Sequence, residues 1–230
     1  MRYSPQAEGL NSYSFTSGVY PEPDIRKSKM NIAVFASGRG TNFSAVIRAV
    51  KKGKIKANLS LLVCDNPRAG AVGRANRAGI KVALVERKDF AANSDFEAKV
   101  NQYLEENKID LIVLAGFMRL ISPEFVNRYK GRILNIHPAL LPSFKGTEGI
   151  KDALDYGVKV TGVTVHFVDE EMDHGPIILQ QAVKIEENDT LKSLEKKIHQ
   201  IEHKLYPQAI RLFVEGKLRI EGRKVVVSNP

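Results

Sequence analysis

The sequence of 230 residues offers little from which a disulfide framework or a membrane span can be built. Its single cysteine, Cys64, excludes an intrachain disulfide framework and a cysteine-rich zinc site. The longest apolar run, Leu111 to Met118, is interrupted by Gly116 and is much shorter than the ~20 residues of a membrane-spanning helix. We therefore expect a cytoplasmic protein of a reducing compartment, with no membrane partner.

Tryptophan is absent and aromatic residues make up only 7% of the chain, although the formal net charge is +9. The positive surplus lies in residues 30–110, which carry 14 basic and 8 acidic residues, whereas residues 111–185 carry 8 of each. A nucleic-acid-binding surface usually draws on a basic arm or on a recognisable reading motif. Neither is present, so we expect no nucleic-acid partner; a site for a small phosphorylated anion would use the same charge.

Residues 1–29 show neither a helical nor a strand period and contain scattered proline, serine, glycine and tyrosine. They also lack the apolar segment that a secretory signal needs. We predict a disordered or irregular N-terminal extension over residues 1–29 and a single domain over residues 30–230.

From Met30 onward, apolar runs alternate with helical stretches. Continuous apolar runs are typical of strands in a parallel sheet that is covered on both faces, and repeated strand–helix units predict right-handed crossovers. The predicted fold is therefore α/β: a doubly wound, mostly parallel sheet with an antiparallel C-terminal portion. The expected strands are 31–37, 59–65, 81–85, 109–117, 132–138, 159–168, 176–185, 217–220 and 224–227. The expected helices are 42–52, 71–78, 95–106, 123–129, 149–156 and 190–215. Ligands of such sheets bind at the carboxyl ends of strands, so the segments that follow strands are the candidates for a site.

The first such segment is the glycine-rich turn Ser37-Gly38-Arg39-Gly40-Thr41-Asn42. A turn of this kind before a helix brings backbone N–H groups and the positive helix end toward an anion. It matches neither the dinucleotide fingerprint, since Phe43 stands at the third glycine position, nor the Walker A pattern. Two interpretations remain. The one we favour is a loop that binds a monophosphate group (a monophosphate cradle). The other is a tight turn that its glycines permit, with Thr41 or Asn42 as the helix cap.

The segment Asn135-Ile136-His137-Pro138 closes the fifth expected strand. Residues two apart in a strand share a face, so Asn135 and His137 point the same way. An amide N–H is a donor suited to an oxyanion, and histidine is the natural proton carrier near neutral pH. We predict that the two side chains converge on one ligand atom, although a single histidine at a strand end also occurs as a structural residue.

An acidic segment, Val168–Pro176, separates two later strands. For Asp169–Glu171 a solvated turn is the main interpretation. Asp173 differs because Gly175 and Pro176 impose a tight exit beside it, and a carboxylate there is able to reach His137, favour its charged form and orient it.

The string His199-Gln200-Ile201-Glu202-His203 matches the H-x-x-E-H pattern of one class of zinc enzymes, with both histidines on one helix face. The third protein ligand that such sites require has no candidate, and lysines surround the string. We therefore expect an exposed amphipathic helix and no metal.

Five segments together resemble the folate-dependent glycinamide ribonucleotide formyltransferase family. They are SGRGTN (37–42), AGFMRLIS (115–122), NIHPALLPSFKG (135–146), VTVHFVDEEMDHGPIILQ (163–180) and IEHKLYP (201–207). The segments occur in the same order as in the family, and the resemblance covers Met30 to about Ile220. It implies a Rossmann-like formyltransferase fold and an enzyme of purine biosynthesis. Such an enzyme transfers the formyl group of 10-formyltetrahydrofolate to the primary amine of glycinamide ribonucleotide, without a metal.

The resemblance also implies roles for single residues. The amide of Asn135 and protonated His137 stabilise the charge that grows on the formyl oxygen of a tetrahedral intermediate, and Asp173 keeps His137 charged and oriented. The implied residues for glycinamide ribonucleotide are Gly40, Thr41, Asn42 and Glu202. The implied residues for the folate are Met118, Arg119, Leu120, Ile121, Asn135, Val168, Asp169 and Asp173.

Three positions depart from the family's pattern. Asn93 stands where many relatives carry a basic residue that reaches the folate, and Lys145–Gly149 replaces a small or histidine-bearing loop. His174 follows Asp173 where a small residue is commoner, and its ring is placed to compete for the carboxylate of Asp173.

Two alternatives to this enzyme remain: formyltetrahydrofolate hydrolase, and a non-catalytic nucleotide- or RNA-binding α/β module. The hydrolase typically carries an N-terminal regulatory domain, which 29 irregular residues cannot form. The module predicts binding that falls steeply with salt and is indifferent to Asn135 and His137. Under the favoured interpretation the partners are the two small-molecule substrates, and the chain is a monomer or a homodimer.

Overall fold

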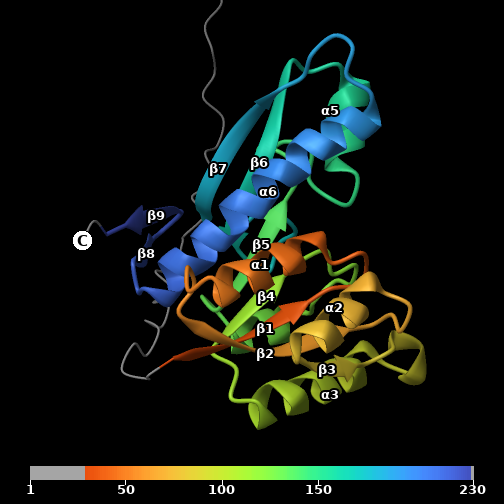
Figure 1. The fold of residues 1–230 in the computed structure, drawn as a ribbon, viewed down its shortest axis with the longest axis vertical. Helices are drawn as coiled ribbons and strands as arrows, with labels where there is room; N and C mark the ends of the chain where they lie inside the picture. The colour runs from red at the N-terminus through yellow and green to blue at the C-terminus, as the bar shows by residue number, and fades with distance from the viewer. Residues whose placement is uncertain (1–28, 229–230) are drawn as a thin grey trace, which may run out of the picture.

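The computed structural model describes residues 29–228, in which strands and helices alternate (Figure 1). The described strands are β1 (Met30–Phe35), β2 (Ala57–Cys64), β3 (Lys81–Leu84), β4 (Leu111–Leu114), β5 (Ile133–His137), β6 (Val160–Phe167), β7 (Ile177–Lys184), β8 (Leu218–Glu221) and β9 (Lys224–Val227). The described helices are α1 (Thr41–Lys51), α2 (Gly70–Ala78), α3 (Asn93–Glu106), α4 (Pro123–Arg128), α5 (Gly149–Tyr156) and α6 (Leu191–Val214), with a short 3-10 helix η1 (Arg87–Asp89). The predicted extension over residues 1–29 lies almost entirely outside the described residues, so the division at residue 30 stays a prediction.

The described strands form one sheet in the order β3-β2-β1-β4-β5-β6-β7-β9-β8. The strands from β3 to β5 are parallel, because a crossover that contains a helix returns each of them to the same end of the sheet. From β5 onward, β6 and β7 pair antiparallel, and β8 and β9 form an antiparallel hairpin. The predicted fold class, a mostly parallel doubly wound sheet with an antiparallel C-terminal portion, is confirmed.

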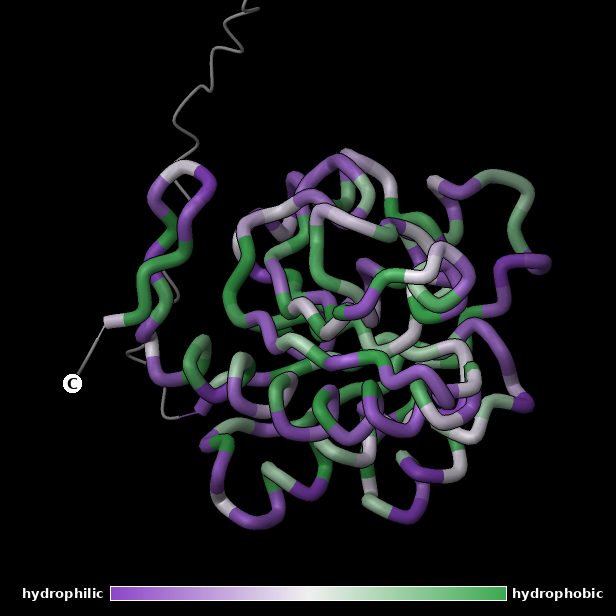
Figure 2. Tube along the Cα trace, turned by 90° about the horizontal axis from the view of Figure 1, so that it is seen from above, coloured by the Kyte–Doolittle hydropathy of each residue, from purple (hydrophilic) through white to green (hydrophobic). Residues whose placement is uncertain are grey.

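Helices cover both faces of the parallel part, and each face has its own apolar cluster. Alternate strand residues such as Val34 and Val113 pack with α1, α2 and α6, whereas Phe35 and its neighbours pack with α3 and α4. Burial of each large apolar side chain contributes roughly 1.5–3 kcal/mol to this packing. Hydrophobic segments accordingly run through the interior of the trace while hydrophilic ones dominate the outer loops (Figure 2).

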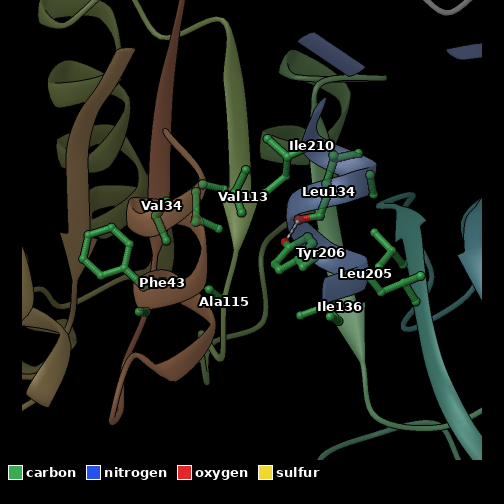
Figure 3. Close-up of a cluster of buried hydrophobic side chains, with 14 of the residues drawn as sticks. Val34, Phe43, Val113, Ala115, Leu134, Ile136, Leu205, Tyr206 and Ile210 are labelled. Carbon is green, nitrogen blue, oxygen red and sulfur yellow. Dashed lines mark hydrogen bonds between the residues drawn. The ribbon is translucent and has the colours of Figure 1, made fainter. Parts of the chain in front are cut away.

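The long helix α6 lies across the sheet and is held to it by Tyr206 (Figure 3). The buried Tyr206 hydroxyl lies 2.7 Å from the carbonyl oxygen of Leu114 and 2.9 Å from that of Leu134, so it can donate to either. These carbonyls belong to β4 and β5, so the contact sets α6 directly against the strands that precede the candidate site. No helix within residues 29–228 combines the length and the apolar character of a membrane span.

The fourth strand is shorter than predicted. We expected residues 109–117 to be extended, but β4 ends at Leu114, and Gly116 takes a positive φ of 75° that turns the chain out of the sheet. The Ser37 backbone N–H donates to the Gly116 carbonyl at 3.0 Å, and the Ser37 hydroxyl accepts from the Met118 N–H at 2.9 Å. These bonds fold the segment after β4 onto the glycine-rich turn instead of extending the sheet.

Candidate active site

The candidate site begins at the end of β5, where alternation places Asn135 and His137 on one face, as predicted. Ile133, two residues before Asn135, packs in the cluster beneath α3 and α4. The antiparallel register sets His166 of β6 opposite Asn135 and Thr164 opposite His137. His137 is only 3% exposed, so its imidazole lies in an environment that penalises charge.

Asp173 reaches both of these side chains from the loop between β6 and β7. Its Oδ2 lies 3.4 Å from His137 Nδ1, and its Oδ1 accepts a long hydrogen bond of 3.4 Å from Asn135 Nδ2. The Gly146 N–H donates to Oδ2 at 2.8 Å. Asp173 therefore contacts both of the residues that are predicted to act with it.

The backbone around Asp173 explains how a loop carboxylate reaches the strand. Asp173 adopts a left-handed backbone conformation with φ 49°, which is uncommon for a residue other than glycine. Two residues later, a Cβ atom on Gly175 would lie 1.9 Å from the Phe167 carbonyl oxygen. The tight exit predicted from Gly175 and Pro176 thus requires glycine, because no side chain fits against the end of β6.

The charges of the site follow from its burial and contacts. Burial lowers the pKa of His137 below its ordinary value of 6.5, and this effect outweighs the opposing attraction of Asp173 and the Phe144 carbonyl, 2.7 Å from Nε2. Asp173 therefore favours the charged form of His137, as expected, but burial opposes it more strongly, and the protonation state of His137 stays a prediction. Burial raises the pKa of Asp173, but the nearby His166 ring, the Gly146 N–H and attraction to His137 together lower it by more, so the net pKa is below its usual 3.8.

His166 of β6 also belongs to this site, as a buried residue that contacts its side chains. Asn135 Nδ2 lies 3.2 Å from His166 Nε2, and His166 Nδ1 lies 2.7 Å from the Phe167 carbonyl oxygen. A carbonyl only accepts, so Nδ1 carries the proton and Nε2 accepts from the amide. His166 Nε2 is also 3.7 Å from Asp173 Oδ1. Its position next to Asn135 follows from the antiparallel register of β6 against β5, which no local sequence pattern shows.

The glycine-rich turn leads into α1 at Gly40, which is the N-cap residue with φ 69°. No side chain caps the helix and its first turn holds no acidic residue, so the interpretation in which Thr41 or Asn42 caps it is wrong. A Cβ on Gly40 would lie 2.9 Å from the Cα of Ala71, which explains the glycine. Uncapped N–H groups at a helix start suit an anion, as the cradle interpretation requires.

Glu202 of α6 meets the start of α1 beside this turn. Its Oε2 accepts from Asn42 Nδ2 at 3.1 Å and lies 2.8 Å from His199 Nδ1. Glu202 is 4% exposed, so the predicted exposed helix is wrong for this face. Asn42 Oδ1 and His203 Nε2 are buried without a hydrogen-bond partner among the described residues. Within residues 29–228 no group of three or more His, Cys, Asp or Glu side chains is arranged to hold a metal ion.

Met118 and Arg119, from the implied folate set, line a cavity of about 650 Å³ near the ends of β1 and β2. Arg119 Nε lies 2.7 Å from Asp65 Oδ2 on its wall. The other lining residues are Ser37, Asn66, Pro67, Arg68, Glu86, Arg87 and Lys88. This cavity does not include the cluster at Asn135, so the structure divides the implied folate set between two places.

The remaining members of the implied folate set differ in their surroundings. Leu120 is 76% exposed, whereas Ile121 and Val168 are partly buried against the cluster beneath α3 and α4. Asp169 Oδ2 lies 2.8 Å from His174 Nδ1. His174 is therefore engaged by Asp169, and not by the carboxylate of Asp173 for which its position allowed it to compete.

The described fold matches a known family along most of its length. The family model described as formyl transferase matches residues 30–210. This chain belongs to the formyl transferase family. A phosphoribosylglycinamide formyltransferase of Bacillus subtilis is 46% identical over 179 residues, which cover 78% of this chain and 92% of that protein. The predicted family and enzyme class, phosphoribosylglycinamide formyltransferase, are confirmed by this similarity.

Two further relatives show how far the similarity extends. The crystal structure of glycinamide ribonucleotide transformylase 1 from Symbiobacterium toebii superposes with a TM-score of 0.86 at 42% identity, covering 88% of this chain and 95% of that one. The trifunctional purine biosynthetic protein adenosine-3 of Gallus gallus is 42% identical over 196 residues, and the chain spans 20% of that relative's length.

The structure shows the contacts made at two positions that depart from the family's pattern. Asn93, which stands where relatives are basic, donates from Nδ2 to Glu97 Oε1 at 3.0 Å, within its own helix. The unusual loop Lys145–Gly149 supplies the Gly146 N–H that holds Asp173. The loop therefore contributes backbone to the site even though its side chains differ.

Proposed function

We propose that this chain transfers the formyl group of 10-formyltetrahydrofolate to the primary amine of glycinamide ribonucleotide. The observation that carries the proposal is the meeting of an amide, an imidazole and a carboxylate at Asn135, His137 and Asp173. The uncapped start of α1, which suits a phosphate, follows β1, and β1 is separated from β5 only by β4 in the sheet. Relatives that bear the name of this enzyme class match most of the chain. These features support formyl transfer over an RNA-binding module, which has no use for the cluster.

The proposed role of His137 follows from its low pKa and its two contacts. Nε2 faces the Phe144 carbonyl and therefore carries the proton of the neutral ring, which leaves the lone pair on Nδ1 beside Asp173. When the amine attacks the formyl carbon, Nδ1 accepts the amine proton. The resulting imidazolium is stabilised by the Asp173 carboxylate and returns the proton to the departing folate nitrogen. One C–N bond forms and one breaks, and no electron acceptor is needed.

The proposed role of Asn135 is to stabilise the oxygen of the tetrahedral intermediate. Its two N–H groups are directed to His166 Nε2 and Asp173 Oδ1 at 3.2 and 3.4 Å. Both contacts are long, so little hydrogen-bond energy is lost when one N–H turns to a negatively charged oxygen. A preorganised donor of this type is worth roughly 3 kcal/mol in the transition state.

The proposed site for glycinamide ribonucleotide uses both helices. The substrate phosphate binds the N–H groups of Gly40, Thr41 and Asn42, and Glu202 contacts the sugar hydroxyls. Support comes from the uncapped start of α1 and from the Asn42–Glu202 contact, which places the turn and the carboxylate side by side. Attraction from Glu202 also raises the pKa of His137, although less than burial lowers it.

For the folate we propose binding along Met118, Arg119, Leu120 and Ile121, with Val168, Asp169 and Asp173 closing the site. The exposed apolar side chains of Met118 and Leu120 support this placement. No metal and no nucleic-acid partner are part of the proposal. We propose the cytoplasm as the compartment and a monomer or a homodimer as the assembly.

The test is a coupled assay with 10-formyltetrahydrofolate in which either glycinamide ribonucleotide or water is the acceptor. Ribonucleotide-dependent release of tetrahydrofolate is the expected result. Release at the same rate without the ribonucleotide would identify the hydrolase instead. Inorganic phosphate is expected to compete with the ribonucleotide, and an absence of competition at high phosphate would contradict the assigned cradle.

A further inference from the structure

The hairpin of β8 and β9 follows α6 and lies beyond residue 210, where the match to the family model ends. It projects beside β7 at the edge of the sheet (Figures 1 and 2). Nothing in the proposed reaction uses this hairpin directly. Its contacts, however, lead to the loop that carries Asp173.

The hairpin is anchored at the point where that loop ends. Lys224, the first residue of β9, pairs in parallel with Ile177, the first residue of β7, and Ile177 directly follows Pro176. Three hairpin side chains pack partly buried against the main apolar cluster: Leu218, Ile220 and Val225. The hairpin therefore has a defined position relative to the loop.

Arg223, the residue before β9, contacts the loop through most of its guanidinium group. Nη2 donates to the His174 carbonyl at 2.6 Å, and Nη1 lies 3.1 Å from both ring nitrogens of His174. Nη1 is also 3.9 Å from Asp169 Oδ2, which lies 2.8 Å from His174 Nδ1. Since Nδ1 donates to Asp169, Nε2 is the ring nitrogen that can accept from Arg223.

These contacts lie on both sides of Asp173 in the chain. Asp173 holds a left-handed backbone conformation with φ 49°, which a non-glycine residue keeps only where its surroundings impose it. Its carboxylate also has to remain within reach of Asn135 and His137, at 3.4 Å from each. A loop fixed at Asp169 and at His174 has little freedom to carry Asp173 away from them.

We propose that Arg223 is a positioning residue for Asp173, acting by fastening Asp169 and His174 to the C-terminal hairpin. This inference rests on the catalytic role proposed for Asp173. Arg223 is 43% exposed, and exposed ion pairs contribute little to global stability. Its loss should therefore alter the loop and the reaction while the fold remains intact.

The experiment compares Arg223→Ala with Arg219→Ala in the full chain. Arg219 is a matched control because it lies on β8 of the same hairpin, is 67% exposed and pairs with Glu221 of that hairpin. In Arg223→Ala we expect amide exchange over residues 168–176 to accelerate by about tenfold, with kcat reduced by roughly the same factor. The KM for glycinamide ribonucleotide and the melting temperature should match those of Arg219→Ala. Arg223→Lys, which keeps the charge but not the planar fork, should recover only part of the loss.

Unchanged exchange over 168–176 in Arg223→Ala would overturn the inference, as would faster exchange with an unchanged kcat. An equal loss of activity in Arg219→Ala would attribute the effect to the hairpin as a whole and would also overturn it. Failure of the proposed site is recognised separately, since Asp173→Asn would then retain turnover. The exchange measurement tests the attachment of the loop whether or not turnover is observed.

Discussion

Asn135 on β5 and His166 on β6 lie directly opposite each other, with the amide nitrogen 3.2 Å from the ring Nε2. The Phe167 carbonyl fixes the proton of His166 on Nδ1, so Nε2 is an acceptor aimed at the amide. The orientation of the Asn135 side chain is therefore set before any substrate arrives. The contact with His166 thus limits how far the amide has to move when the N–H that faces Asp173 turns to the oxyanion.

Replacing His166 by Phe should reduce kcat by roughly 3- to 10-fold, the size expected for one net hydrogen bond. The aromatic ring fills the same buried space, so the sheet should persist while the amide loses its acceptor. His166→Gln, which can offer an acceptor, should lose less. Steady-state kinetics on both variants check this, and wild-type kcat in His166→Phe would show that the contact has no part in the reaction.

Asp173→Asn and His137→Ala should each lower kcat by about 10²- to 10⁴-fold, the range typical of lost acid–base catalysis. Asparagine keeps the size of the side chain but removes the charge that stabilises the imidazolium. Neither residue touches the proposed phosphate cradle, so the calorimetric Kd for glycinamide ribonucleotide should stay nearly unchanged. Normal turnover in either variant contradicts the role assigned to that residue.

Gly40→Ala should destabilise the chain and weaken ribonucleotide binding together. The left-handed backbone at Gly40, with φ 69°, costs an alanine about 1–2 kcal/mol. The added Cβ would also lie 2.9 Å from the Ala71 Cα. Gly38→Ala is the control in the same turn, since a Cβ there meets nothing within 4 Å. Urea denaturation should separate the two, with Gly38→Ala within about 0.5 kcal/mol of the wild type; equal stabilities would refute the strain argument.

The hydrogen bond between His199 and Glu202 should make stability depend on pH in a definite direction. This bond raises the pKa of His199 above 6.5, and the raising effect exceeds the opposing burial. A raised histidine pKa adds stability that is complete below the unfolded value of 6.5 and is lost as the pH rises through the folded pKa. His199→Gln should therefore cost more at pH 6 than at pH 9, by roughly 1 kcal/mol. Thermal unfolding at both pH values measures this, and an equal loss at both would contradict it.

Local patterns located most of the strands and helices, because the apolar period of each element is carried by residues that are close in the chain. The run expected at 31–37 corresponds to β1, and the helix expected at 190–215 corresponds to α6, which is one residue shorter at each end. The pattern failed at 109–117, where apolar composition continued past Gly116 although the backbone turned. It also misjudged Glu202, whose burial depends on the approach of α1 from 160 residues earlier in the chain.

Three features follow from the order of the amino acids alone: the alternation of elements, the same-face pair Asn135 and His137, and the glycine-rich start of α1. These depend on the two-residue period of a strand and on the conformations open to glycine. Three others appear only in the folded chain: His166 lies opposite Asn135, burial lowers the pKa of His137, and Arg223 reaches the loop of Asp173. Such relationships join residues tens of positions apart, and they exist only after strand pairing and helix packing have placed those residues side by side.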